Sequence, residues 1–271
     1  MVWSWDHSQP AAVQKILKVK PNYGGEDCGR PHATKPPKSH TMKIGGFQKF
    51  SLIDYPNKIS CVLFTLGCNF RCGYCHNPEL LEMRSDSMEL FSVKEIMDFL
   101  ESRVGKLEGV VITGGEPTIQ KGLLDFISEI KEMGFLVKLD TNGSSPVVLR
   151  KALNLVDYVA MDIKGPLSKY EEISGYKHAR DNNDLKKSIE LILGSGVDHE
   201  FRTTVVKGQL DKKDFLEIGK MVAGAQRYIL QKFLPTKTLD KSFLKRKSFS
   251  DEEFDEVIGV LQDFVGECFV R

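Results

Sequence analysis

The chain has 271 residues, of which 41% are hydrophobic and 28% charged, and its 38 basic and 37 acidic side chains leave a net charge of +1. This near-neutral balance gives no electrostatic basis for binding nucleic acid or a membrane surface, and no apolar run approaches the roughly 18 residues that span a bilayer. The N-terminus also lacks the basic and apolar regions of a secretion signal. Three of the six cysteines lie close together, which is typical of metal binding in a reducing compartment and predicts a cytoplasmic protein.

The first 41 residues differ in composition from the rest of the chain. They contain five of the eleven prolines, three of the six histidines and both tryptophans, and they have too few apolar residues for a core. We predict a mobile tail over residues 1–41 and a folded domain over residues 42–271. We expect Met42 to be the functional start, so that the tail would not be part of the native protein.

From Met42 onward, apolar and β-branched runs alternate with amphipathic segments, which is typical of buried parallel strands linked by helices. Six such units fall short of the eight that close the common barrel. The predicted fold class is therefore α/β, as a partial (βα)6 TIM-like barrel that stays open and ends with a C-terminal helix. The predicted strands span 59–66, 109–113, 135–140, 157–163, 200–206 and 228–233, and the predicted helices span 92–103, 118–133, 146–154, 183–194, 211–223 and 250–265.

Polar and glycine-rich segments follow these predicted strands. The carboxyl ends of parallel barrel strands form one rim, where active sites are built. We therefore expect a single pocket that contains a metal site, a glycine-rich segment, two or three carboxylates, a lysine and an arginine. Its parts are the cysteine segment after the first strand, GGEP (114–117) after the second, DTNG (140–143) after the third, Asp162 and Lys164 at the end of the fourth, and Arg202 within the fifth.

The cysteine segment, CNFRCGYC (68–75), supplies three thiols and no fourth ligand. A structural zinc site normally closes with four ligands, and His76 could complete a Cys3His set, although two adjacent residues would then strain to reach one ion. A [4Fe-4S] cluster held by three thiolates keeps one iron open for an outside ligand. The segment therefore favours a catalytic cluster at Cys68, Cys72 and Cys75. The other two cysteines of the predicted domain, Cys61 and Cys268, are predicted to lie in the core.

The spacing C-x3-C-x2-C, with Tyr74 before the last cysteine, resembles the signature of the radical S-adenosylmethionine enzymes, and TGGEP resembles their second motif. The resemblance implies that S-adenosylmethionine chelates the open iron through its amino and carboxylate groups, and that Tyr74 and the GGE segment lie against the cofactor. From the residues alone, Gly114 and Gly115 would allow a close backbone approach and Glu116 would offer a carboxylate to an ammonium group. A plain turn after a strand is the alternative for GGEP.

Residues 50–78, FSLIDYPNKISCVLFTLGCNFRCGYCHNP, resemble the opening of the glycyl-radical-enzyme activases, in particular that of anaerobic ribonucleoside-triphosphate reductase. The resemblance runs from about Met42 to the last predicted strand. It implies a partial (βα)6 barrel, a glycyl-radical enzyme as partner, and a flavodoxin or ferredoxin-type electron donor. It also implies that Asp54 meets the glycine loop of the partner.

The same resemblance assigns the charged residues at the strand ends. It implies that Asp140, Thr141 and Asp162 form a monovalent-cation site beside the cofactor carboxylate, with Lys164 nearby, and that Arg202 lies near the reacting centre. A structural ion-pair network is the alternative for these charges.

The expected reaction is reductive cleavage of S-adenosylmethionine to methionine and a 5′-deoxyadenosyl radical, which takes a hydrogen atom from a glycine of the partner. Pro235-Thr236-Lys237 stands where pyruvate formate-lyase activase carries Pro-x-His for the ribose, so no residue is assigned to that contact. Three alternatives stay open: an activase of the pyruvate formate-lyase type, a radical enzyme for a small molecule such as a deazapurine carboxylate synthase, and a non-catalytic zinc or iron-sulfur binding module.

Overall fold

The computed structural model describes residues 42–82, 90–177 and 183–271, so the predictions for residues 1–41 lie outside it. The described residues form one eight-stranded sheet whose spatial order follows the chain, and β1 and β8 are its two edges. β1 is antiparallel to β2, and all later neighbours are parallel. The strands are β1 (Ile44–Ser51), β2 (Ser60–Thr65), β3 (Gly109–Gly114), β4 (Leu136–Thr141), β5 (Tyr158–Asp162), β6 (Asp198–Val205), β7 (Arg227–Lys232) and β8 (Glu267–Val270).

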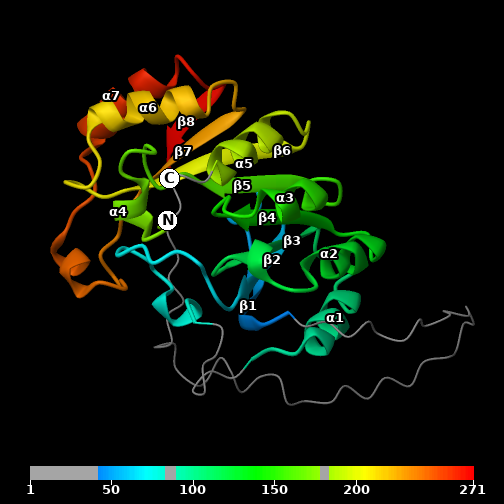
Figure 1. Cartoon of the computed structure of the whole chain (residues 1–271). Coiled ribbons are helices and arrows are strands. Elements are labelled where there is room, and N and C mark those ends of the chain that lie inside the picture. The colour runs from blue at the N-terminus through cyan, green and yellow to red at the C-terminus, as the bar shows by residue number, and fades with distance from the viewer. Residues whose placement is uncertain (1–41, 83–89, 178–182) are drawn as a thin grey trace, which may run out of the picture.

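The helices lie along the outer side of the curved sheet, as Figure 1 shows, and the sheet forms an open, partial barrel. None of the helices in the described part of the chain combines the length and apolar character that crossing a membrane requires. The α-helices are α1 (Val93–Glu101), α2 (Leu123–Glu132), α3 (Pro146–Ala152), α4 (Tyr170–Ser174), α5 (Asp184–Leu193), α6 (Lys212–Met221) and α7 (Asp251–Leu261), and the short 3-10 helices are η2 (Pro78–Leu80), η3 (Pro117–Ile119) and η4 (Lys241–Lys245).

The six predicted strands and the six predicted helices are all present, and the open α/β barrel is confirmed. The strands β1 and β8, the short helix α4 and the 3-10 helices η2 and η4 were not predicted. The predicted helix over 118–133 is divided, because Gly122 has a left-handed backbone (φ 85°) and α2 begins only after it. Capping boxes at Ser92 and Ser250 begin α1 and α7.

The strands separate an apolar outer layer from a polar barrel interior. Successive side chains of a strand point to opposite faces. Along β4, Val137 and Leu139 join the core that packs against the helices, whereas Lys138 and Asp140 face the other side and form an ion pair there. Cys61 is fully buried in the same core, and Cys268 packs partly buried against it. The polar interior of the barrel is where the predicted site residues meet.

Candidate active site

The cysteine loop between β2 and η2 is held in place from two distant parts of the chain. On one side, the Arg71 amide donates to the Ser174 carbonyl at the end of α4, over 2.7 Å. On the other side, the Asp240 amide donates to the Gly73 carbonyl over 2.9 Å, from the segment that leads into η4. Phe243 of η4 is buried against this face of the loop. The shape of the loop therefore depends on the folded barrel and not only on its own sequence.

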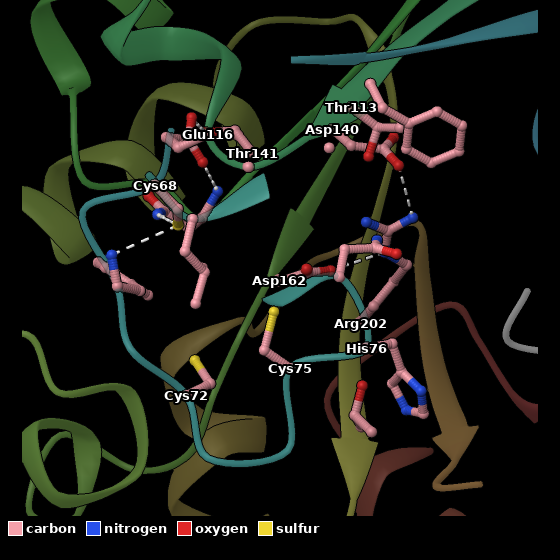
Figure 2. Close-up of a pocket in the computed structure, with 18 of the residues that line it drawn as sticks. Cys68, Cys72, Cys75, His76, Thr113, Glu116, Asp140, Thr141, Asp162 and Arg202 are labelled. Atoms are coloured by element: carbon pink, nitrogen blue, oxygen red, sulfur yellow. Dashed lines mark hydrogen bonds and ion pairs between the residues drawn. The ribbon is translucent and has the colours of Figure 1, made fainter. Parts of the chain in front are cut away.

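All predicted site residues line a single pocket of about 240 Å³. Figure 2 shows Cys72 and Cys75 on the loop with their sulfur atoms directed toward the interior of this pocket, and Cys68 across from them. The structure thus brings together side chains from the loop and from the ends of several strands. The predicted residues that line the pocket are Asp54, Cys68, Cys72, Tyr74, Cys75, Gly114, Gly115, Glu116, Asp140, Thr141, Asp162, Lys164 and Arg202.

The three thiols are protonated at neutral pH in the absence of metal. Burial raises the pKa of Cys68 to about 12 and that of Cys72 to about 11, and it also raises the pKa of Cys75, while the nearby Lys164 ammonium works against each of these shifts. Binding a metal therefore displaces their protons, as it does at thiolate sites generally. In residues 42–82, 90–177 and 183–271, no three His, Cys, Asp or Glu side chains converge closely enough to hold one metal ion.

Two aromatic residues of the loop carry buried polar atoms that have no hydrogen-bond partner in the described structure. They are the hydroxyl of Tyr74 and both ring nitrogens of His76, and both residues line the pocket. Burial lowers the pKa of His76, so its ring is neutral at pH 7. Buried polar atoms are normally hydrogen-bonded, so these three atoms are suited to a ligand inside the pocket.

Glu116 of the GGEP turn is buried and joins the ends of β3 and β4. Its Oε1 accepts hydrogen bonds from Thr118 N at 3.0 Å, Thr118 Oγ1 at 2.5 Å and Thr141 Oγ1 at 2.7 Å. Its Oε2 accepts from Asn142 N at 2.6 Å. Burial raises the pKa of this carboxyl although all four donors oppose the shift. Oε2 accepts this single bond from Asn142 N, whereas Oε1 accepts three, so Oε2 has capacity for another donor in the pocket.

The two glycines of the turn allow close approach to the protein's own backbone. A Cβ on Gly115 would lie 2.0 Å from the Gly67 carbonyl oxygen, and one on Gly114, where φ is 108°, would lie 2.4 Å from Thr65 N. Neither position tolerates a side chain. This packing explains the need for glycine without any ligand, so the expected contact with a cofactor stays a prediction.

Arg202 of β6 connects two carboxylates at the strand ends. Its Nε donates to Asp162 Oδ1 at 2.8 Å and its Nη1 to Asp140 Oδ2 at 3.0 Å, as Figure 2 shows. Lys164 Nζ donates to the other oxygen of Asp162 at 3.1 Å. Burial disfavours the charged form of Asp162, but Arg202 and Lys164 outweigh it and hold the pKa well below its usual range. The predicted residues form an ion-pair network and also line the pocket.

Asp54 lies in the turn between β1 and β2 and reaches the same pocket. Its carboxylate accepts a hydrogen bond from the Ser51 hydroxyl, and its amide donates to that hydroxyl at 3.2 Å. The apolar side chains that precede it in sequence are exposed, among them Leu52 at 62% and Ile53 at 45%. Asp54 therefore stands in a fixed orientation beside an exposed apolar turn.

No individual role was predicted for Asn142 or Lys138. Asn142 donates through its side chain to Asn69 Oδ1 at 2.9 Å and lies 3.9 Å from the sulfur of Cys68. Lys138 pairs with Asp140 from inside the barrel. The two-residue spacing of Lys138 and Asp140 within one strand was the available signal, because it puts both side chains on the same face.

Comparisons with known proteins agree with this geometry. The model of the radical SAM superfamily matches residues 62–221. A Methanocaldococcus jannaschii protein, named provisionally as a glycyl-radical enzyme activating enzyme, is 34% identical over 235 residues, which cover 84% of this chain and 95% of that protein. The chain belongs to the radical SAM superfamily, among its glycyl-radical-enzyme activases.

Two further proteins are similar to this radical SAM enzyme. The pyruvate formate-lyase-activating enzyme of Clostridium pasteurianum is 30% identical over 203 residues, which cover 73% of this chain and 83% of that one. The crystal structure of a radical SAM methyltransferase from Sphaerobacter thermophilus has a TM-score of 0.64 at 14% identity, covering 82% of this chain and 68% of that one. The latter match shows the shared fold.

The residues of this radical SAM enzyme fit the cluster and the cofactor that its family implies. Three thiols on one loop match the donor set of a [4Fe-4S] cluster with one open iron. The unpartnered atoms of Tyr74 and His76 and the open capacity of Glu116 Oε2 offer polar contacts to a bound molecule beside it. The predicted set of cofactor-binding residues is therefore consistent with the shape and chemistry of the pocket.

Proposed function

We propose that this protein cleaves S-adenosylmethionine reductively and generates a glycyl radical on a partner enzyme. The observation that carries the proposal is the convergence of the three thiols, the strand-end charges and Asp54 on one pocket. The names of the relatives from M. jannaschii and C. pasteurianum both refer to activation of such enzymes. The catalytic domain would span residues 42–271, and the cytoplasmic location stays a prediction.

In this proposal the chain holds the cluster and orients S-adenosylmethionine, while these bound groups supply the radical chemistry. Cys68, Cys72 and Cys75 would hold the cluster, which when bound delivers one electron to S-adenosylmethionine and so releases methionine and the 5′-deoxyadenosyl radical. Cys72 is buried and Cys68 and Cys75 are half-buried, so the protein would shield the cluster in part from water. The residues that would bind and orient the cofactor are Tyr74, Gly114, Gly115, Glu116, Asp140, Thr141, Asp162 and Lys164.

Arg202 and Asp54 would act on the substrate side. Arg202 is fixed by two carboxylates, so it offers a rigid positive charge near the reacting centre, which suits a site that depends on orientation. Asp54 would accept hydrogen bonds from backbone amides of a glycine loop, since Ser51 holds its carboxylate in place. A glycine fits as target because its α-hydrogen is not shielded by a side chain and its backbone enters narrow sites.

We infer anaerobic ribonucleoside-triphosphate reductase as the partner and a flavodoxin or ferredoxin-type protein as the electron donor, on the resemblance of residues 50–78 to the activases of that reductase. A pyruvate formate-lyase type enzyme is the alternative partner. Both belong to the same reaction class, so the test must include both proteins.

The decisive experiment is electron paramagnetic resonance on anaerobic mixtures of the cluster-loaded protein, reductant, S-adenosylmethionine and one of the two partner enzymes from the same organism. We expect a persistent glycyl radical with the reductase. Asp54→Ala should suppress this signal while uncoupled cofactor cleavage continues, and Asp98→Ala, on the exposed surface of α1, should behave as wild type.

Other outcomes separate the alternatives. A glycyl radical only on the pyruvate formate-lyase type enzyme would change the partner and keep the reaction. Absence of any organic radical together with rapid cofactor cleavage in the presence of a small molecule, such as a deazapurine precursor, would replace the activase proposal. Stoichiometric zinc in protein kept strictly without oxygen would indicate a non-catalytic binding module.

A further inference from the structure

The barrel interior beside the cysteine loop contains a third cation in addition to Lys164 and Arg202. Lys138 on β4 is 1% exposed, and its Nζ lies 2.5 Å from Asp140 Oδ1. An ammonium group is buried at acceptable cost only when it is paired and hydrogen-bonded. The position of Lys138 is therefore fixed by its contact with Asp140.

Every carboxylate oxygen of the two aspartates has its own cationic donor. Lys138 and Arg202 occupy the two oxygens of Asp140, and Arg202 and Lys164 occupy the two oxygens of Asp162. The group also includes the buried Glu200, whose Oε1 lies 3.8 Å from Arg202 Nη1 and 3.6 Å from Arg271 Nη1. Four cations and three carboxylates therefore give it a net charge of +1. A net positive charge suits the carboxylate of a bound cofactor.

These contacts do not fit the free monovalent cation that the resemblance assigned to Asp140, Thr141 and Asp162. A hard cation needs oxygen ligands that turn toward it, and here the carboxylates turn toward nitrogen donors. The hydroxyl of Thr141 is also engaged, since it donates to Glu116 Oε1 at 2.7 Å and accepts from Gly143 N at 3.1 Å. A further cation would add to a group that is already positive.

We propose that the ammonium of Lys138 stands in permanently for a free cation, so that this chain binds S-adenosylmethionine independently of potassium and sodium. Lys138 is a positioning residue that acts through Asp140, which in turn holds Arg202. It lies two residues before Asp140 in β4 and therefore on the same face of the strand. The inference rests on the cofactor-binding part of the proposed function and not on the identity of the partner.

The proposal makes a specific statement about Lys138→Gln. This variant leaves three cations against three carboxylates, a net charge of 0, and it opens Asp140 Oδ1 to another cation. A dissolved potassium ion would restore the charge of +1. The variant should therefore acquire a requirement for potassium that the wild type does not have.

The test compares S-adenosylmethionine affinity of the cluster-loaded protein by anaerobic calorimetry in potassium chloride and in tetramethylammonium chloride at equal ionic strength. The wild type and Lys138→Arg, which keeps the charge, should bind equally in both salts. Lys138→Gln should bind about tenfold more tightly in potassium chloride, the size of one charge-assisted contact. Lys94→Gln, which removes an exposed ammonium paired with Asp98, is the matched control.

A second readout needs neither cluster nor cofactor. Potassium should raise the melting temperature of metal-free Lys138→Gln saturably, because a ligand that binds only the folded state stabilises it, and it should leave the wild type unchanged. A saturable potassium effect on the wild type, or none on a folded Lys138→Gln, overturns the proposal. If Lys138→Gln does not fold, the proposal is tested by the wild type and Lys138→Arg, whose affinity for S-adenosylmethionine should be the same in both salts. Failure of the wild type to bind S-adenosylmethionine in either salt would refute the proposed function, while the melting experiment would still test the cation inference.

Discussion

Glu116→Gln should destabilise the metal-free protein even though no ligand is present. The carboxylate connects the ends of β3 and β4 through Thr118, Thr141 and Asn142. In the variant, one amide oxygen can keep the three donors of Oε1, but the amide nitrogen then faces the Asn142 N–H, so that two donors oppose each other. A hydrogen bond to a charged group contributes about 1.5–3 kcal/mol, and leaving a buried donor unsatisfied costs a similar amount.

Burial offsets part of this loss, because the neutral side chain avoids the desolvation that raises the pKa of Glu116. We therefore expect a net decrease of about 2 kcal/mol in the free energy of unfolding. For a domain of this size that corresponds to a fall of about 4–8 °C in melting temperature. The assay is thermal and urea unfolding of the reduced apoprotein, followed by circular dichroism.

The matched control is Glu256→Gln, which removes a carboxylate that is 63% exposed and paired with Lys212 on the surface. Its melting temperature should equal that of the wild type. A melting temperature of Glu116→Gln that also equals the wild-type value would refute the reasoning, since the four contacts would then add nothing to stability.

The remaining predictions concern iron, pH, the cofactor and the tail. Cys72→Ala should prevent binding of about four irons per chain and abolish S-adenosylmethionine cleavage, whereas Cys61→Ala should change stability alone; equal iron content in both variants would contradict the cluster assignment. The free energy of unfolding of the reduced apoprotein should fall as the pH rises above about 9, because buried thiols with raised pKa values stay protonated in the folded state while those of the unfolded chain ionise; a flat urea midpoint between neutral and alkaline pH would contradict this sign. Glu116→Ala should weaken S-adenosylmethionine binding about tenfold or more, as calorimetry on a variant still folded at the assay temperature would measure. Intact mass of endogenous protein should correspond to a start at Met42, and a full-length species would contradict this.

The sequence was informative where a pattern repeats within one element. Continuous β-branched runs predicted β2 to β7, because strands buried on both faces are apolar along their whole length. β1 contains two adjacent glycines and has several exposed side chains, so it does not have this pattern. β8 has only four residues, alternately exposed and half-buried, and such a short segment gives no reliable period.

The sequence was sufficient to predict which residues form the site, but not which contacts they make with one another. The spacing of the cysteines and the order of the strands were sufficient to predict that these residues line one pocket. The structural task of Glu116 depends on Thr141 and Asn142, which lie 25 and 26 residues away, and no local pattern joins them. The spacing of Lys138 and Asp140 places them on one face of β4, but the burial of that face depends on the curvature of the sheet, which no local pattern gives.

The two backbone hydrogen bonds that hold the cysteine loop in place have a consequence for the biogenesis of the protein. The loop comes early in the chain, yet its backbone is fixed by Ser174 and by Asp240, which are synthesised much later. When only the cysteines have left the ribosome, the loop still lacks the two hydrogen-bond partners that fix its backbone. We therefore expect iron and sulfide to be inserted stably only after ribosomal synthesis has passed Asp240, so that cluster delivery would act on a nearly complete polypeptide.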